Sequence, residues 1–266
     1  MRSTSFRAGR GDLGDGEAGD TVRRRDALKE RALRYMTVPL SVRTSDLPVR
    51  IASAVVMLAV AIGAVLAGDL WLDVLIVLVT FASWAEFVRL VPRATSKLSA
   101  RVISLISGTL YICSAGYILT QLPIAMIIGV VGAVIFVDSF AYGFGRTLGG
   151  PKIAPRISPS KTWAGLLGGV VGASVWLGLF SAQIAPAIDG SVAERVAPTS
   201  IISIVLVGLV VAIAAQSGDF LESWLKRKAA VKDSSNLIPG HGGFFDRTDG
   251  IIPVVLLAGL FLNSSL

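Results

Sequence analysis

The sequence predicts an all-α, polytopic integral membrane protein with about seven transmembrane helices. Of its 266 residues, 53% are hydrophobic and 16% are charged, and the mean hydropathy is +0.70. Soluble globular chains have about 45–50% apolar and about 25% charged residues. Seven runs have the apolar character of helices that cross the roughly 30 Å hydrocarbon core of a bilayer. They cover residues 51–68, 70–91, 102–120, 123–143, 162–184, 200–217 and 251–266.

The seventh run is the weakest of these candidates. It is short and contains Pro253, so a tilted or only partly inserted helix is an alternative to a full crossing. The other six runs are uninterrupted enough to be assigned as spans.

The distribution of Lys and Arg predicts the direction of the chain. If the N-terminus is cytoplasmic and the spans alternate, the cytoplasmic segments are 1–50, 92–101, 144–161 and 218–250. Together with Arg89 at the edge of one of them, they contain all of the 25 basic residues except Arg195. Cytoplasmic loops of membrane proteins are enriched in Lys and Arg. The net charge of +7 is therefore interpreted as a basic cytoplasmic face, and no nucleic acid partner is expected.

Composition divides the chain into three parts. Residues 1–46 form a basic cytoplasmic tail that is expected to be disordered, because its first twenty residues are rich in Gly, Arg and Asp. Residues 47–121 are expected to form the N-terminal transmembrane helices. Residues 122–266 are expected to form a C-terminal transmembrane domain, which we predict to be the catalytic one because it contains the polar segments described below. For the tail, docking on anionic lipid and a plain topology signal both stay open.

Polar residues gather at the cytoplasmic end of the sixth run. If the helix continues past residue 217, Asp219, Glu222, Ser223 and Lys226 lie on one face. Ion pairing on a solvated helix end would explain such a stripe. A functional site is the alternative, and the next segment favours it.

The segment 232–250 combines glycines, acids and bases. Asp246 and Asp249 are three residues apart at the start of the last predicted helix and are expected to share a face. Carboxylates without soft ligands indicate Mg²⁺, and Lys232 and Arg247 are phosphate-binding residue types. One cysteine, Cys113, and one histidine, His241, leave no Cys/His metal centre and no internal disulfide. The inventory is typical of phosphoryl or nucleotidyl transfer.

A second polar segment lies at the end of the fourth run. Asp138 falls inside that run, and carboxylates in a membrane are functional candidates by default. Ser158 or Ser160 is expected to cap the fifth helix, which would place Lys161 where a phosphate is favoured.

The residues of these two segments resemble a known family. The run S-x-x-K-R-x4-K-D-x3-L-I-P-G-H-G-G-x2-D-R-x-D, from Ser223 to Asp249, is similar to the signature of the phosphatidate cytidylyltransferases, also called CDP-diacylglycerol synthases. The stretch from Asp138 to Trp163 resembles a second motif of that family. The strong similarity covers less than half of the chain, about residues 138–249.

The resemblance implies a nucleotidyltransferase of phospholipid biosynthesis in a bacterial cytoplasmic (inner) membrane. It implies that CTP and phosphatidate give CDP-diacylglycerol and pyrophosphate with Mg²⁺, at a site on the cytoplasmic side. The number of metal ions, an additional monovalent cation and a homodimer stay open. The implied metal ligands are Asp219, Asp246 and Asp249, which together with Lys226 form the catalytic set. The implied substrate-binding residues are Asp138, Lys161, Ser223, Arg227, Lys232, His241 and Arg247.

Other functions remain alternatives. A polyprenol kinase or an archaeal-lipid cytidylyltransferase would also use CTP and a lipid, and product analysis separates them. A transporter should place charged residues near the middle of the bilayer on broken helices. Here the charges crowd one surface, which disfavours a transporter.

Overall fold

The computed structural model describes residues 47–188 and 200–263. The predicted tail 1–46 and the outer loop with Arg195 lie outside the described residues. The chain divides into two units, residues 1–51 and 52–266. The described part of the first unit is the start of helix α3, and everything below concerns the second unit.

Six helices of the described part are long and apolar enough to cross a membrane. Each coincides with one of the first six predicted runs, and the chain is therefore a multi-pass membrane protein. They are α3 (Leu47–Ala67), α4 (Asp69–Ala94), α5 (Leu98–Gln121), α6 (Ile124–Thr147), the segment Trp163–Gln183 and α10 (Ile201–Lys228). The fifth segment consists of α7 (Trp163–Leu179) and a π-helical turn, η1 (Phe180–Ile184).

The seventh run forms a shorter helix, α12 (Ile251–Asn263), of 13 residues. At 1.5 Å per residue this helix is about 20 Å long, which is less than the roughly 30 Å of a hydrocarbon core. Two single-turn helices, α8 (Ala185–Ile188) and α11 (Phe245–Thr248), complete the described helices.

The loop between α6 and α7 is a small antiparallel hairpin, which the all-α prediction did not include. Strand β1 (Lys152–Ala154) pairs with β2 (Ser158–Thr162). Because β2 continues to Thr162, that residue caps α7, and its hydroxyl accepts a hydrogen bond from the Gly165 N–H at 3.0 Å. The expectation that Ser158 or Ser160 is the cap was wrong, because both lie in the strand.

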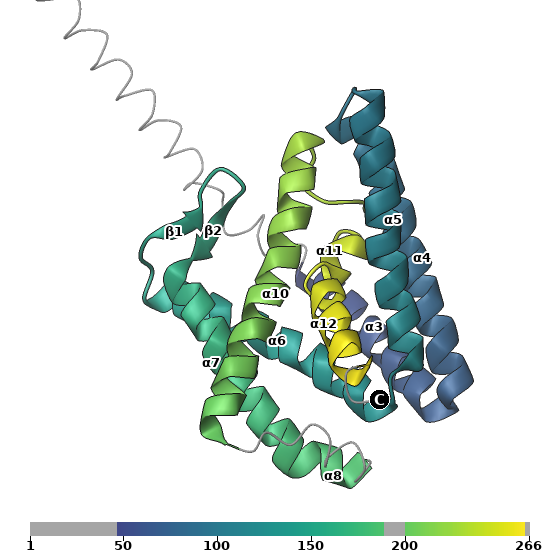
Figure 1. Ribbon diagram of the computed structural model, residues 1–266. Coiled ribbons are helices and arrows are strands. Elements are labelled where there is room, and N and C mark those ends of the chain that lie inside the picture. Colours follow the sequence, from purple (N-terminus) through teal and green to yellow (C-terminus); the bar gives the residue numbers. More distant parts are fainter. Residues whose placement is uncertain (1–46, 189–199, 264–266) are drawn as a thin grey trace, which may run out of the picture. The chain divides into compact units, whose positions relative to one another are not determined.

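The helices pack around one core. Figure 1 shows α10 between α7 on one side and α5 and α12 on the other, and α6 and α7 form an antiparallel pair. The Trp176 indole N–H of α7 donates to the Gly129 carbonyl of α6 at 2.8 Å. Fully buried side chains from α4, α5, α6, α7, α10 and α12 meet in the core, among them Leu90, Ile112, Val137, Ala212 and Val255.

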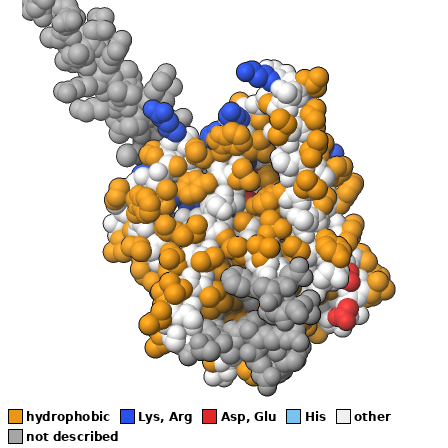
Figure 2. All heavy atoms as spheres, viewed as in Figure 1, with side chains coloured by type: hydrophobic (Ala, Val, Ile, Leu, Met, Phe, Trp, Pro, Cys, Tyr) orange, Lys and Arg blue, Asp and Glu red, His pale blue; other side chains and the backbone are white. Residues whose placement is uncertain are grey.

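The exterior is apolar over most of its surface and basic at one end. Figure 2 shows hydrophobic side chains covering the visible flanks, while Lys and Arg gather at the end that holds the hairpin and the C-terminus of α10. Many large apolar residues of α3, α4, α5 and α10 are exposed. Such a surface is unfavourable in water but suits lipid chains.

Candidate functional site

Three carboxylates converge near the C-terminal end of α10. Asp219 and Glu222 come from successive turns of α10, and Asp249 follows the short helix α11. One oxygen from each of the three lies within 4.8 Å of the other two. Asp219 is the nineteenth residue of α10, about 27 Å along its axis, so the cluster lies where a span approaches the membrane surface.

A glycine allows the two chain segments to meet. A Cβ at Gly218 would lie 1.9 Å from the Asp249 carbonyl oxygen and 2.8 Å from its carbonyl carbon. The backbone that carries Asp249 therefore rests directly on α10. The sequence analysis included Gly218 only as the first residue of the predicted cytoplasmic segment 218–250 and predicted no role for it.

Two lysines flank the acidic cluster. Lys226 Nζ bridges Glu222 at 2.7 Å and Asp246 at 2.9 Å. Lys161, on strand β2, forms an ion pair with Asp219. The structure thus confirms that Asp219, Glu222 and Lys226 share one face of α10, and it adds Lys161 from the hairpin.

Asp246 is beside this cluster rather than in it. Its carboxylate accepts hydrogen bonds from the Gly243 N–H at 2.8 Å, the Ser234 N–H at 3.0 Å and Lys226. Burial raises the pKa of Asp246, but hydrogen bonds with Glu222, Gly243 and Lys226 outweigh burial and lower it to about 2. Asp246 therefore holds the loop in place through these contacts, and its predicted role as a metal ligand with Asp219 and Asp249 stays a prediction.

The group Asp219, Glu222 and Asp249 fits a hard divalent cation. Burial raises the pKa of the Asp249 carboxyl well above its ordinary value, and the adjacent Asp219 raises it further. Glu222 is 2% exposed, and its Oε1 has no hydrogen-bond partner among the described residues. Crowded carboxylates with an unused buried oxygen match the all-oxygen ligands that Mg²⁺ takes.

Glu86 is a polar residue that the sequence analysis missed. It lies on α4, is 1% exposed, and accepts four hydrogen bonds. The donors are the hydroxyls of Ser234 and Ser235 and the N–H groups of Phe244 and Phe245, at 2.8, 2.6, 3.1 and 2.8 Å respectively. An acid inside an otherwise apolar span was the signal that could have identified it. Glu86 anchors both ends of the loop that carries Asp246.

Replacing Glu86 by glutamine is expected to loosen this loop. The amide NH₂ would face N–H and O–H donors, and two charge-assisted hydrogen bonds would be lost, a cost of about 3 kcal/mol. Since about 1.4 kcal/mol is a factor of ten, chymotrypsin should cleave after the buried Phe245 about 100-fold faster, as followed by mass spectrometry.

Ser235→Ala is the graded control for that variant. It removes one of the four bonds and should accelerate cleavage by roughly tenfold or less. Equal cleavage rates in wild type and Glu86→Gln would show that Glu86 does not anchor the loop.

A polar cavity of about 430 Å³ adjoins the cluster between α6, β2, α7 and α10. Asp138, Lys161 and Asp219 all line it, which brings together three of the residues selected from the sequence. Its volume lies within the range of about 300–1,000 Å³ that is typical of small-molecule sites. The remaining lining residues include Tyr142, Arg146, Ser160, Thr162 and Gln216.

Other predicted residues have partners outside the acidic cluster. Arg227 Nε donates to the Ile157 carbonyl of the hairpin at 3.3 Å, and Arg247 donates to the His241 carbonyl at 2.6 Å. His241 Nδ1 is 2.7 Å from the Ser53 hydroxyl of α3. Ser223 is half-buried on α10, and Lys232 is exposed on the loop that follows.

The fold and this site define a class of protein: a multi-pass membrane protein with an acidic and basic site at one end of its helices. Residues 118–265, more than half of the chain, match the model of the cytidylyltransferase family. The chain belongs to the cytidylyltransferase family.

Curated relatives agree with this assignment. The phosphatidate cytidylyltransferase of Rickettsia typhi is 32% identical over 204 residues, which cover 76% of this chain and 86% of the relative. That of Brucella melitensis is 44% identical over 124 residues, 47% of this chain and 42% of the relative. The phosphatidate cytidylyltransferase of Rickettsia bellii is 42% identical over 130 residues, which cover 47% of this chain and 54% of the relative. The chain thus spans less than half of the Brucella protein and about half of the R. bellii protein.

Proposed function

We propose that the protein transfers the cytidylyl group of CTP to phosphatidate and releases pyrophosphate. The observation that carries this proposal is the position of the Asp219, Glu222 and Asp249 cluster. Asp219 lines a polar cavity, and Thr248, next to Asp249 in the chain, lines an apolar one. Such a site can receive one reactant from water and one from the membrane. The names of the relatives favour the same reaction.

The reaction needs positioning and charge neutralisation more than a base. An oxygen of the phosphatidate phosphate is already anionic near neutral pH and attacks the α-phosphorus of CTP. A new P–O bond forms, the bond between the α-phosphorus and the bridging oxygen breaks, and pyrophosphate leaves with the electron pair. Lys161 and Lys226 flank the cluster and supply positive charge to these phosphates.

Asp219, Glu222 and Asp249 would hold Mg²⁺, and Asp246 would fix the loop and Lys226 beside them. Bound there, the ion supplies charge neutralisation for the triphosphate and polarisation of the α-phosphorus. Glu222 takes the place in the ligand set that the sequence analysis gave to Asp246.

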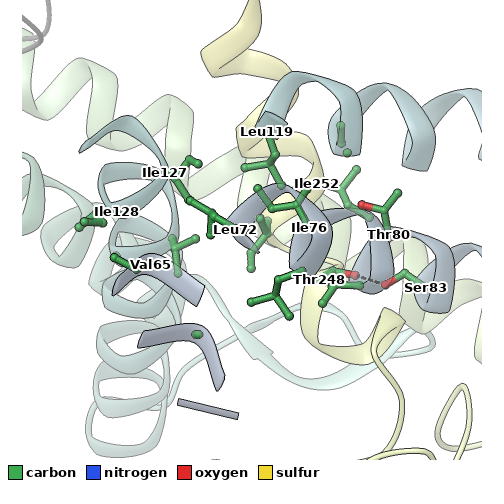
Figure 3. Close-up of a pocket in the computed structure, with 18 of the residues that line it drawn as sticks. Val65, Leu72, Ile76, Thr80, Ser83, Leu119, Ile127, Ile128, Thr248 and Ile252 are labelled. Carbon is green, nitrogen blue, oxygen red and sulfur yellow. Dashed lines mark hydrogen bonds between the residues drawn. The ribbon is translucent and has the colours of Figure 1, made fainter. Parts of the chain in front are cut away.

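An apolar cavity of about 650 Å³ supports a lipid substrate. Helices α3, α4, α5, α6 and α12 line it, and Figure 3 shows Leu72, Ile76 and Ile252 pointing into it. At one end the lining is polar: the hydroxyls of Ser83 and Thr248 are hydrogen-bonded to each other at 3.1 Å. Thr248 directly precedes Asp249 in the chain. An acyl chain in this cavity would bring its headgroup to the acidic cluster.

The proposed reaction also predicts how the protein is oriented in the membrane. The basic end of the helices faces the cytosol, where CTP is found, and the N-terminus lies on that side of a bacterial cytoplasmic membrane. The concentration of Lys and Arg around the site supports this placement.

The decisive experiment incubates purified protein with labelled CTP, phosphatidate and Mg²⁺ and identifies the products. CDP-lipid together with pyrophosphate is the expected result. Phosphorylated lipid together with CDP would instead identify a lipid kinase and refute the proposal.

Removing divalent cations is expected to stop the reaction. EDTA should abolish CDP-lipid formation, and excess Mg²⁺ should restore it, because crowded carboxylates and a triphosphate cannot be neutralised by Lys161 and Lys226 alone. Product formation in EDTA at the untreated rate would contradict the metal assignment.

A further inference from the structure

Gln216 is a buried amide without an evident structural role. It lies on α10, one turn before Asp219, and is 3% exposed. Neither its Oε1 nor its Nε2 has a hydrogen-bond partner among the described residues. An unpaired buried amide is unfavourable, and most buried polar groups in native proteins are paired.

The position of Gln216 connects it with the polar cavity. Gln216 lines the cavity at its buried end, together with Thr162 and Gly165. The Thr162 hydroxyl accepts the hydrogen bond that caps α7, and it forms no hydrogen bond with the Gln216 amide. The exposed side of the cavity holds Tyr142 and Arg146.

The hydrogen-bonding pattern of an amide selects among possible ligands. Oε1 accepts, and Nε2 donates two hydrogens beside it. A phosphate only accepts and would leave Oε1 unpaired, while a cation would leave Nε2 unpaired. The cytosine ring presents a donor, the 4-amino group, next to an acceptor, N3, and can pair with both amide atoms at once.

The geometry of α10 agrees with a nucleotide. Gln216 and Asp219 are one turn apart, about 4.5 Å along the axis, and both line the same cavity. A nucleotide bound in this cavity could contact Gln216 with its base and reach Asp219 and Lys161 with its phosphates, since all three residues line it. Arg146 supplies a further positive charge at the exposed side.

On the basis of the function proposed above, we infer that Gln216 recognises the cytosine of CTP, with Oε1 accepting from the 4-amino group and Nε2 donating to N3. Gln216 is then the residue that reads the base, while the acidic cluster and the lysines act on the phosphates. This assigns the polar cavity to the nucleotide and the apolar cavity to the lipid.

The test removes each partner separately. Gln216→Met keeps the length of the side chain without the amide, and a CTP analogue without the 4-amino group removes the partner on the base. Each change alone should lower kcat/KM for the nucleotide roughly tenfold or more. Combined, they should cost little more than Gln216→Met alone, because the same interaction is lost. The KM for phosphatidate should stay unchanged.

Several outcomes would overturn the inference. If the decreases in kcat/KM caused by Gln216→Met and by the analogue multiply when the two changes are combined, Gln216 does not contact the 4-amino group. Coupling of Gln216→Met to 2′-deoxy-CTP rather than to the 4-amino analogue would place the ribose at the amide. Gln121→Met is the matched control, since Gln121 is exposed at the end of α5, and it should behave as wild type.

If the Met variant does not fold, Gln216→Glu keeps the test decisive. It retains an acceptor for the 4-amino group and loses the donor to N3, so it should turn over CTP more slowly but still prefer CTP to the analogue. Loss of that preference would refute the pairing. Turnover of CTP by wild type is measured first: its absence refutes the proposed function, whereas turnover with uncoupled losses refutes only the role of Gln216.

Discussion

Asp219→Asn is expected to lower the rate of CDP-lipid formation at least about 100-fold, the scale on which single electrostatic groups contribute to catalysis. Asp219 has two partners in the structure, the carboxylate cluster and Lys161. The amide would weaken cation binding and release Lys161 from its ion pair. The variant should keep the same thermal unfolding temperature in detergent to within a few degrees, because Asp219 is only half-buried.

The matched control for this variant is Asp69→Asn. Asp69 is exposed in the first turn of α4 and is outside the site, so its amide should leave the rate unchanged. The measurement is the steady-state rate across a range of Mg²⁺ concentrations. A wild-type rate in Asp219→Asn at every Mg²⁺ concentration would remove Asp219 from the metal site.

Gly218→Ala should be as damaging as the loss of a carboxylate, although it changes no charge. The new Cβ would stand 1.9 Å from the Asp249 carbonyl oxygen, so the backbone at Asp249 must move away from α10. Displacement of a catalytic group by about 1 Å can cost roughly 100-fold in rate. Overpacking should also destabilise the fold by about 1–3 kcal/mol, which a lower unfolding temperature would report.

Gly63→Ala separates this steric effect from the general effect of alanine in a helix. Gly63 lies on α3 with no heavy atom within 4 Å of the position of a Cβ, so alanine there should be neutral or slightly stabilising. Full activity in Gly218→Ala would show that the close approach of Asp249 to α10 is unnecessary for function.

The transmembrane helices could be predicted because each one depends only on the residues of its own segment. Six apolar runs became six helices because backbone groups in lipid must be paired within their own segment. The hairpin Lys152–Thr162 was not predictable in this way, since its residues are polar and its pairing depends on contacts between strands. The capping of α7 by Thr162 follows from that hairpin.

The site was predictable in part for the same reason. The stripe of Asp219, Glu222 and Lys226 follows from the helical period alone, and the structure confirms it. The contacts of Glu222 and Asp246, which meet at Lys226, depend on the path of the loop 229–249. Glu86 lies 148 residues before its partner Ser234, and no local pattern connects the two.

The sequence by itself determined that the chain is a membrane protein, where its first six helices run and which segments carry the polar chemistry. Hydropathy and helical period are local properties, and a bilayer allows few alternatives to a helix. Only the tertiary structure decided which carboxylates meet, because Asp249 reaches Asp219 through a close backbone approach at Gly218. It also decided that Glu86 holds the loop and that Gln216 faces the polar cavity. Contacts between residues far apart in the chain depend on how helices pack, and packing is set by all of their side chains together.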